Sequence, residues 1–202
     1  MSKYSIISGS SRNDNQSIRV ASLLARSLRE ASTEDEVFVL DLSEVTLPQW
    51  HEGFWSEPIP DPVWAEVSEE LTQSDGIILV CPEWNGIVPP ALLNVFLLTS
   101  RGEMAHKPGL VVTVSANMGG AYPIALLRGF ASKNTQICFI PDHLIIRNVS
   151  TFLENVNQQD QIALDLRDRI EYSLGLFVVY AAAFKAIRQS GAIDLESFPY
   201  GM

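Results

Sequence analysis

The sequence predicts a doubly wound α/β fold, in which a parallel sheet carries helices on both of its faces. Short apolar runs alternate with segments of helical periodicity along the chain. Two of these runs, residues 76–81 and 110–114, are apolar almost throughout, as is typical of parallel strands buried on both faces. Loops rich in Gly, Pro, Ser or Asn follow three strands. Ligands of such sheets bind beyond the carboxyl ends of the strands, so these loops form the candidate binding site.

The expected strands are short apolar runs bounded by turn residues. In chain order they lie at residues 4–7, 37–42, 76–81, 110–114 and 136–140, with 144–146 as an extension of the last. Between the second and third strands, residues 48–62 are rich in Pro, Trp and acidic side chains. This composition predicts an irregular loop that is exposed or covers a site.

The expected helices follow the strands and repeat apolar side chains at helical spacing. In chain order they lie at residues 17–32, 63–73, 89–100, 123–131 and 160–189. Ser17 is the expected N-cap of the first helix, because its hydroxyl can accept a hydrogen bond from the first turn. Proline opens the helix at 89–100, as is common in a first turn. The last helix is expected to be interrupted or bent near Gly175.

Composition and charge limit the classes of function. The chain has 202 residues, 47% of them hydrophobic, and fits a single domain over residues 1–202. Its net charge is −10 and no basic cluster is present, which argues against a nucleic-acid partner. The two cysteines, Cys81 and Cys138, lie in apolar runs and suit a reducing cytoplasm. The apolar run at 174–184 is shorter than the roughly 20 residues of a membrane helix. We therefore expect a cytoplasmic protein in which that run is a buried helix or an oligomer face.

The loop after the first strand predicts a phosphate site. Residues 9–17 join a strand directly to a helix start, where unpaired backbone N–H groups and the helix dipole favour an anion. Arg12 can donate two parallel hydrogen bonds to phosphate oxygens, while Ser10, Gln16 and Ser17 donate from the other side. The loop matches neither the P-loop nor the G-x-G-x-x-G pattern. The alternative is an ordinary strand-to-helix turn with a cap.

The loop after the third strand, Pro82-Glu83-Trp84-Asn85-Gly86, suits a flat ring system. It contains an aromatic residue and turns sharply at Asn85-Gly86, so it can present backbone groups to the polar edge of a ring. Flavin is the planar ligand that fits beside a monophosphate. A simple proline-bounded turn remains an alternative, and Glu83 is as well explained by a solvated or capping carboxylate as by a catalytic one.

The two motifs together resemble one family. The first motif is Gly9-Ser10-x-Arg12 with Gln16-Ser17, and the second is Pro82-Glu83-Trp84-Asn85-Gly86-x-x-Pro89-x-Ala91-Leu92-x-Asn94. With these motifs the chain resembles the NADPH-dependent FMN reductases over about residues 3–149. The resemblance implies a flavodoxin-like five-stranded parallel sheet of order 2-1-3-4-5 and a noncovalently bound FMN. It also implies a homodimer or homotetramer in which NADPH or NADH reduces the FMN. The electrons then pass to free flavin, a quinone, an azo dye or a metal oxyanion.

The same resemblance assigns the site residues by position. Ser10, Arg12, Gln16 and Ser17 would hold the FMN phosphate, and the ring would lie on Pro82, Glu83, Trp84, Asn85 and Gly86. Ser115 and Gly119 correspond to the third loop. The chain departs from the family pattern at Trp84, which replaces a tyrosine, at Asn15 and at Pro90. No catalytic side chain is expected, because the cofactors carry the hydride.

Other chemistries find less support in the sequence. His51, His106 and His143 show no metal-ligand spacing, so no metal site is predicted. Cys81 is not followed by the arginine that a thiol phosphatase requires. Two alternatives to a reductase stay open: a flavin-binding electron carrier or redox-responsive interaction protein, and a fold that has lost its cofactor.

Overall fold

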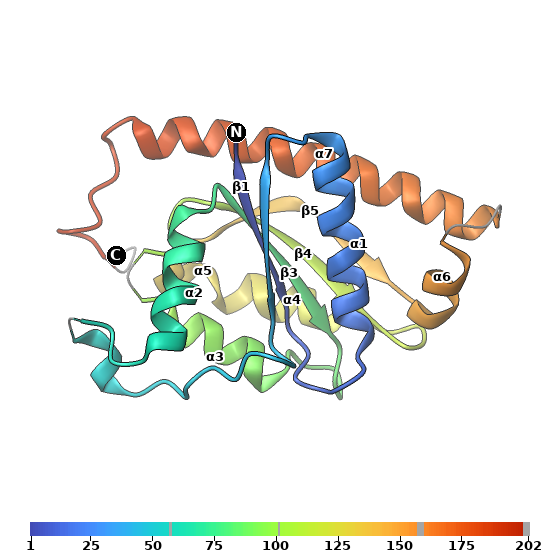
Figure 1. Ribbon diagram of the computed structural model, residues 1–202, viewed down its shortest axis with the longest axis horizontal. Coiled ribbons are helices and arrows are strands. Elements are labelled where there is room, and N and C mark those ends of the chain that lie inside the picture. Colours follow the sequence, from blue (N-terminus) through green and yellow to red (C-terminus); the bar gives the residue numbers. More distant parts are fainter. Residues whose placement is uncertain (57, 101, 157–159, 200–202) are drawn as a thin grey trace.

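The computed structural model describes residues 1–56, 58–100, 102–156 and 160–199. One sheet of five parallel strands has the order β2-β1-β3-β4-β5, as Figure 1 shows. The strands are β1 (Lys3–Ser8), β2 (Glu36–Asp41), β3 (Gly76–Pro82), β4 (Pro108–Val114) and β5 (Cys138–Ile146). Every residue of the central strands β3 and β4 is buried, which is why their sequences carry no polar face. The predicted fold class and strand order are confirmed.

Helices cover both faces of the sheet. One face carries α1 (Gln16–Ala31), α6 (Val149–Asn155) and α7 (Gln161–Gln189), and the other carries α2 (Pro62–Gln73), α3 (Pro90–Leu98), α4 (Tyr122–Phe130) and α5 (Ser132–Thr135). A short 3-10 helix, η1 (Glu52–Trp55), lies in the loop before α2. A hydrophobic core fills the space between the sheet and each group of helices. The core beneath α1, α6 and α7 includes Ile6, Leu24 and Phe177. The core on the other face includes Trp64, Ile77 and Leu92.

Three local predictions were wrong. Asn15, and not Ser17, caps α1: its Oδ1 accepts from the Ile18 N–H at 2.9 Å, so Ser17 lies buried in the first turn. The helix thus begins one residue earlier than expected. α7 continues through Gly175 without interruption. The short elements η1, α5 and α6 were not foreseen, because elements of four to seven residues depend on the contacts around them.

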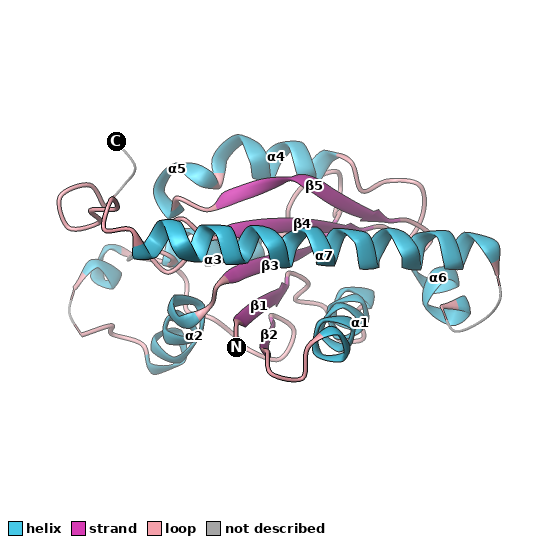
Figure 2. Ribbon diagram, turned by 90° about the horizontal axis from the view of Figure 1, so that it is seen from above, coloured by secondary structure: helices cyan, strands magenta, loops and turns pink. Residues whose placement is uncertain are grey.

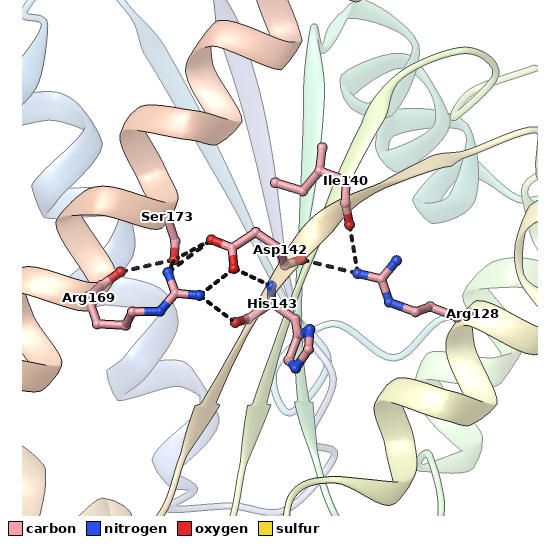
Figure 3. Close-up of polar contacts among 6 residues, drawn as sticks. All are labelled: Arg128, Ile140, Asp142, His143, Arg169 and Ser173. Carbon is pink, nitrogen blue, oxygen red and sulfur yellow. Dashed lines mark hydrogen bonds and ion pairs between the residues drawn. The ribbon is translucent and has the colours of Figure 1, made fainter.

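An ion-pair cluster centred on Asp142 ties the edge strand β5 to helices on both faces (Figure 3). On one side Arg169 of α7 binds both carboxylate oxygens of Asp142, and the Ser173 hydroxyl donates to Oδ2 at 2.9 Å. On the other side Arg128 of α4 donates to the Ile140 and Asp142 carbonyls at 2.6 and 3.1 Å. These carbonyls are free for Arg128 because the β4–β5 register shifts at this point. Hydrogen bonding from Arg169 lowers the pKa of Asp142.

Lys107 is a buried cation at the opposite end of the sheet. Its ammonium donates to three backbone carbonyls, those of Leu71 at 2.6 Å and of Thr72 and Glu103 at 2.7 Å. Two of these acceptors belong to the last turn of α2, so Lys107 caps that helix. Burial, reinforced by the charge of Arg188, lowers the pKa of Lys107 to about 7.

We expect Lys107 to make the stability of the protein rise with pH. Between the folded pKa of about 7 and the unfolded value near 10.4, the unfolded chain binds more protons, so the free energy of unfolding increases with pH. Relative to Lys107→Met, the wild type should gain about 2 kcal/mol from pH 7 to pH 9 in urea unfolding. Burial raises the thiol pKa of Cys81 to about 12, which also makes stability depend on pH. Both proteins contain Cys81, so its contribution cancels when the wild type is compared with Lys107→Met. Parallel pH profiles for the two proteins would contradict this role.

Candidate functional site

The fold brings the three predicted loops together at one edge of the sheet. They follow β1, β3 and β4, which are adjacent parallel strands whose carboxyl ends face the same way (Figure 1). The N–H of Gly9 in the first loop donates to the Val80 carbonyl of β3 at 2.8 Å. Glu83 of the second loop accepts from the Gly120 N–H of the third loop at 2.6 Å. One backbone hydrogen bond and one hydrogen bond to a side-chain carboxylate therefore join the three loops.

The first loop has several donors that the chain itself does not use. Among the described residues, the backbone N–H groups of 13–17 donate no hydrogen bond, and the guanidinium of Arg12 has no partner. The backbone of Arg12 is nevertheless held, since its N–H donates to Ser10 Oγ at 3.4 Å and its carbonyl accepts from Asn15 Nδ2 at 2.9 Å. Asp14 turns the chain with a φ of 47°. The result is an ordered loop with unpaired donors at a helix N-terminus, which is the chemistry a phosphate requires.

A buried hydroxyl beneath this loop is also unpaired. Ser8 closes β1 with none of its surface exposed, and its Oγ has no hydrogen-bond partner among the described residues. Leaving such a group unpaired costs about 1–3 kcal/mol, so an acceptor is expected nearby when the site is filled. Ser10 and Ser17 of the first loop are buried as well. Gln16 accepts from Arg19 Nη1 at 2.9 Å through its side-chain oxygen. The amide nitrogen of Gln16 stays available as a donor.

The second loop is a tight hairpin turn. Trp84 and Ile87 exchange backbone hydrogen bonds of 3.2 and 2.9 Å, and Asn85 and Gly86 between them have φ values of 49° and 76°. Two consecutive positive φ angles are typical of a type I′ turn, for which Asn-Gly is the preferred sequence. The N–H groups of Asn85 and Gly86 have no partner within the described chain. A ring system laid against this turn would find two donors that the described chain does not use.

Glu83 holds the third loop. Its Oε2 binds the Gly120 N–H, and its Oε1 lies so close to Gly119 that a Cβ there would be 2.9 Å away. Arg147 Nε binds the Gly119 carbonyl at 3.0 Å, and the Ser115 N–H donates to the Ile146 carbonyl at 2.9 Å. Of the two interpretations that the sequence left open, the structure supports a capping carboxylate.

Two further residues border the site. Cys81 is the penultimate residue of β3. Burial, with the charge of Glu83, raises its thiol pKa to about 12, so it is protonated at neutral pH. Tyr122, at the start of α4, is 70% exposed, and its ring atom Cδ2 would lie 4.0 Å from a Cβ on Gly86. Sequence analysis missed Tyr122, and its place two residues after Gly119-Gly120 was the available signal. Among the described residues, no group of three His, Cys, Asp or Glu is arranged to hold a metal.

Grooves flank helix α3 next to these loops. One, of about 640 Å³, runs between α3 and α4–α5 and is lined mainly by apolar side chains that include Ile87, Phe96 and Phe130. Another, of about 590 Å³, lies between α3 and the chain before η1 and reaches Ser11 of the first loop. Leu97 lines both grooves and is 57% exposed, so it forms a ridge between them.

Comparison with known proteins identifies the family. A family model described as NADPH-dependent FMN reductase matches residues 2–151. The chain belongs to this family. A quinone reductase from Pseudomonas putida is 31% identical to this chain over 122 aligned residues. The alignment covers 58% of this chain and 62% of the quinone reductase. The chain therefore aligns with less than two thirds of that relative's length.

Solved structures share the fold of this family member. An oxidoreductase from Corynebacterium diphtheriae superposes with a TM-score of 0.72 and 12% identity, covering 91% of this chain and 98% of that one. The flavoenzyme NAD(P)H:(acceptor) oxidoreductase of Paracoccus denitrificans gives a TM-score of 0.69 with 16% identity, covering 91% and 99%. The family predicted from the sequence is confirmed, and the cofactors named in its description, FMN and NADPH, are those that the resemblance implied.

Proposed function

We propose that this chain, as one FMN-binding domain, transfers hydride from NADPH or NADH through bound FMN to a quinone, a free flavin or a similar small acceptor. The observation that carries the proposal is a set of donors at the carboxyl edge of the sheet that have no partner within the described chain. They are the Arg12 guanidinium, the N–H groups of Gln16 and Ser17 at the start of α1, and the N–H groups of the Asn85-Gly86 turn. Bound FMN supplies the hydride chemistry, and the protein supplies binding, orientation and electrostatics.

Each loop has its own task in this proposal. Arg12, Ser10, Ser17 and the amide nitrogen of Gln16 bind the phosphate. Pro82, Glu83, Trp84, Asn85 and Gly86 support the ring, and the two turn N–H groups stabilise negative charge at its polar edge during reduction. Ser115 and Gly119 close the far side of the site, where Glu83 holds the third loop by its bond to Gly120. Tyr122 lies beside the turn and contacts the acceptor.

The protein is proposed to act in the cytoplasm as a homo-oligomer. Leu97 forms an exposed ridge with a groove on each side. The Leu97 ridge of a second copy can fit into one of these grooves and receive the first copy's ridge in its own groove. Leu126 and Phe130 of α4, each 41% exposed, extend the apolar surface. An exposed patch of this kind marks an interaction site in soluble proteins.

Steady-state and half-reaction kinetics test the activity. Oxidation of NADPH with a quinone or FMN as acceptor should exceed the rate with free FMN in the absence of protein. In anaerobic half-reactions NADPH should bleach the visible flavin band of the protein, and the quinone should restore it. Protein that binds FMN but shows neither bleaching nor turnover above free flavin would refute the enzyme and favour an electron carrier.

A further inference from the structure

Glu83 carries a negative charge with which no cation of the described chain forms an ion pair. By contrast, the carboxylates of Asp142 and Asp75 each bind an arginine. Arg147 lies beside the third loop, but its Nε donates to the Gly119 carbonyl and its side chain is exposed, so water screens its charge. Glu83 is itself partly buried, and its charge is therefore screened less.

The position of this charge is fixed by hydrogen bonds at both ends of the residue. The backbone N–H of Glu83 donates to the Val114 carbonyl at the end of β4 at 3.0 Å, and its Oε2 accepts from the Gly120 N–H at 2.6 Å. Figure 2 shows β3 and β4 side by side in the sheet, so the loops that follow them leave the sheet at neighbouring points. The carboxylate therefore lies between the second and third loops.

The structural role of Glu83 does not require a charge. Holding the third loop needs only an oxygen that accepts from Gly120, and the side-chain oxygen of a glutamine can accept the same bond. Withdrawing a carboxylate from water costs free energy when no cation pairs with it. Since a neutral acceptor would satisfy the loop, the charge needs an explanation of its own.

The charge of Glu83 acts on its surroundings. Burial and, after it, this charge raise the thiol pKa of Cys81 to about 12. The same field disfavours any negative charge that develops near the second loop. In the proposed function the flavin ring lies on residues 82–86, and hydride transfer from NADPH brings it two electrons and one proton, a net gain of one negative charge. The N–H groups of Asn85 and Gly86 stabilise that charge, and Glu83 opposes them.

We propose that the charge of Glu83 holds the reduction potential of bound FMN low and so makes the reduced cofactor a stronger donor to the acceptor. Glu83 is thus a positioning residue: its hydrogen bond places the third loop, and its charge sets the energy at which electrons leave the site. The inference rests on the FMN binding of the proposed function, but not on NADPH oxidation or on the identity of the acceptor.

Glutamine substitutions separate the charge from the hydrogen bond. Glu83→Gln keeps an acceptor for Gly120, and the control Glu34→Gln removes one charge at an exposed position before β2, at the opposite edge of the sheet. Each FMN-loaded protein is reduced anaerobically by xanthine and xanthine oxidase beside a reference dye, so no NADPH is needed. For Glu83→Gln we expect the equilibrium constant for reduction to rise about tenfold, a positive shift of about 30 mV for a two-electron couple. Glu34→Gln should keep the wild-type potential.

The affinities for the two oxidation states give a second readout. Because potential and binding are linked, the preference for reduced over oxidised FMN should be about tenfold greater in Glu83→Gln than in the wild type. Glu83→Ala removes the hydrogen bond together with the charge. It should raise the potential and also lower the midpoint of urea unfolding, whereas Glu83→Gln should keep the wild-type midpoint.

The outcomes distinguish the charge from other causes. An unchanged potential in Glu83→Gln overturns the inference. An equal shift in Glu34→Gln also overturns it, because net charge would then be the cause, and so does a shift confined to Glu83→Ala, which would assign the effect to the geometry of the third loop. A wild type that fails to bind FMN overturns the proposed function together with the inference. A shifted potential in protein that does not oxidise NADPH overturns the enzyme alone.

Discussion

Replacing Arg12 with alanine is expected to weaken FMN binding about 10- to 150-fold, which corresponds to the roughly 1.5–3 kcal/mol of a charged hydrogen bond. The guanidinium is free of partners in the described chain while its backbone is already held by Ser10 and Asn15. Little ordering of the loop is therefore needed on binding, and most of the interaction appears as affinity. Titration of the apoprotein with FMN, followed by calorimetry or quenching of flavin fluorescence, measures the change.

Two further variants make this result specific. Arg26 lies on the exposed side of the same helix with only a long contact of 3.9 Å to Glu30, so Arg26→Ala should leave the FMN dissociation constant unchanged. Arg12→Lys should recover part of the loss, because the charge remains while the paired donors of the guanidinium are gone. An Arg12→Ala protein that binds FMN as tightly as the wild type would rule out the assigned role.

Gly120→Ala is expected to lower the free energy of unfolding by about 2–4 kcal/mol and to weaken FMN binding as well. Gly120 has a φ of 102°, a region that other residues seldom adopt. A Cβ there would lie 2.5 Å from Ile145 Cγ2 and 3.2 Å from Thr113 Oγ1, atoms of two neighbouring strands that cannot easily move. Any shift of Gly120 also strains its hydrogen bond to Glu83 and so disturbs the second and third loops together.

The matched control for this substitution is Gly129→Ala. Gly129 lies in α4, and an added Cβ would meet no heavy atom within 4 Å. Alanine should stabilise the protein there by up to about 1 kcal/mol, since it costs less backbone entropy in a helix. Urea unfolding of both variants checks the contrast. Equal stability of Gly120→Ala and the wild type would show that the third loop tolerates a side chain and that its geometry is not set by Gly120.

The extent of prediction differs between the core and the site. The strands β3 and β4 were predictable because a strand buried on both faces has a continuous apolar sequence. The type I′ turn at Asn85-Gly86 was signalled for a related reason, since few residues tolerate consecutive positive φ angles. The cap of α1 was misassigned because the polar residues 13–17 offer several possible caps. The conformation of the loop selects among them, and here it turns at Asp14.

By itself the sequence determined the alternation of strands and helices, the three loops at the sheet edge and the family, because local patterns of apolarity, turns and short motifs carry that information. Only the tertiary structure decided which polar groups the chain satisfies internally and which it leaves for a ligand. Glu83 accepts from Gly120, 37 residues away, whereas the Arg12 guanidinium and Ser8 Oγ have no partner among the residues that the structure describes. The structure likewise decided which side of the apolar helix α7 meets the sheet. Hydrogen-bond satisfaction and burial depend on segments far apart in the chain, so no local pattern can specify them.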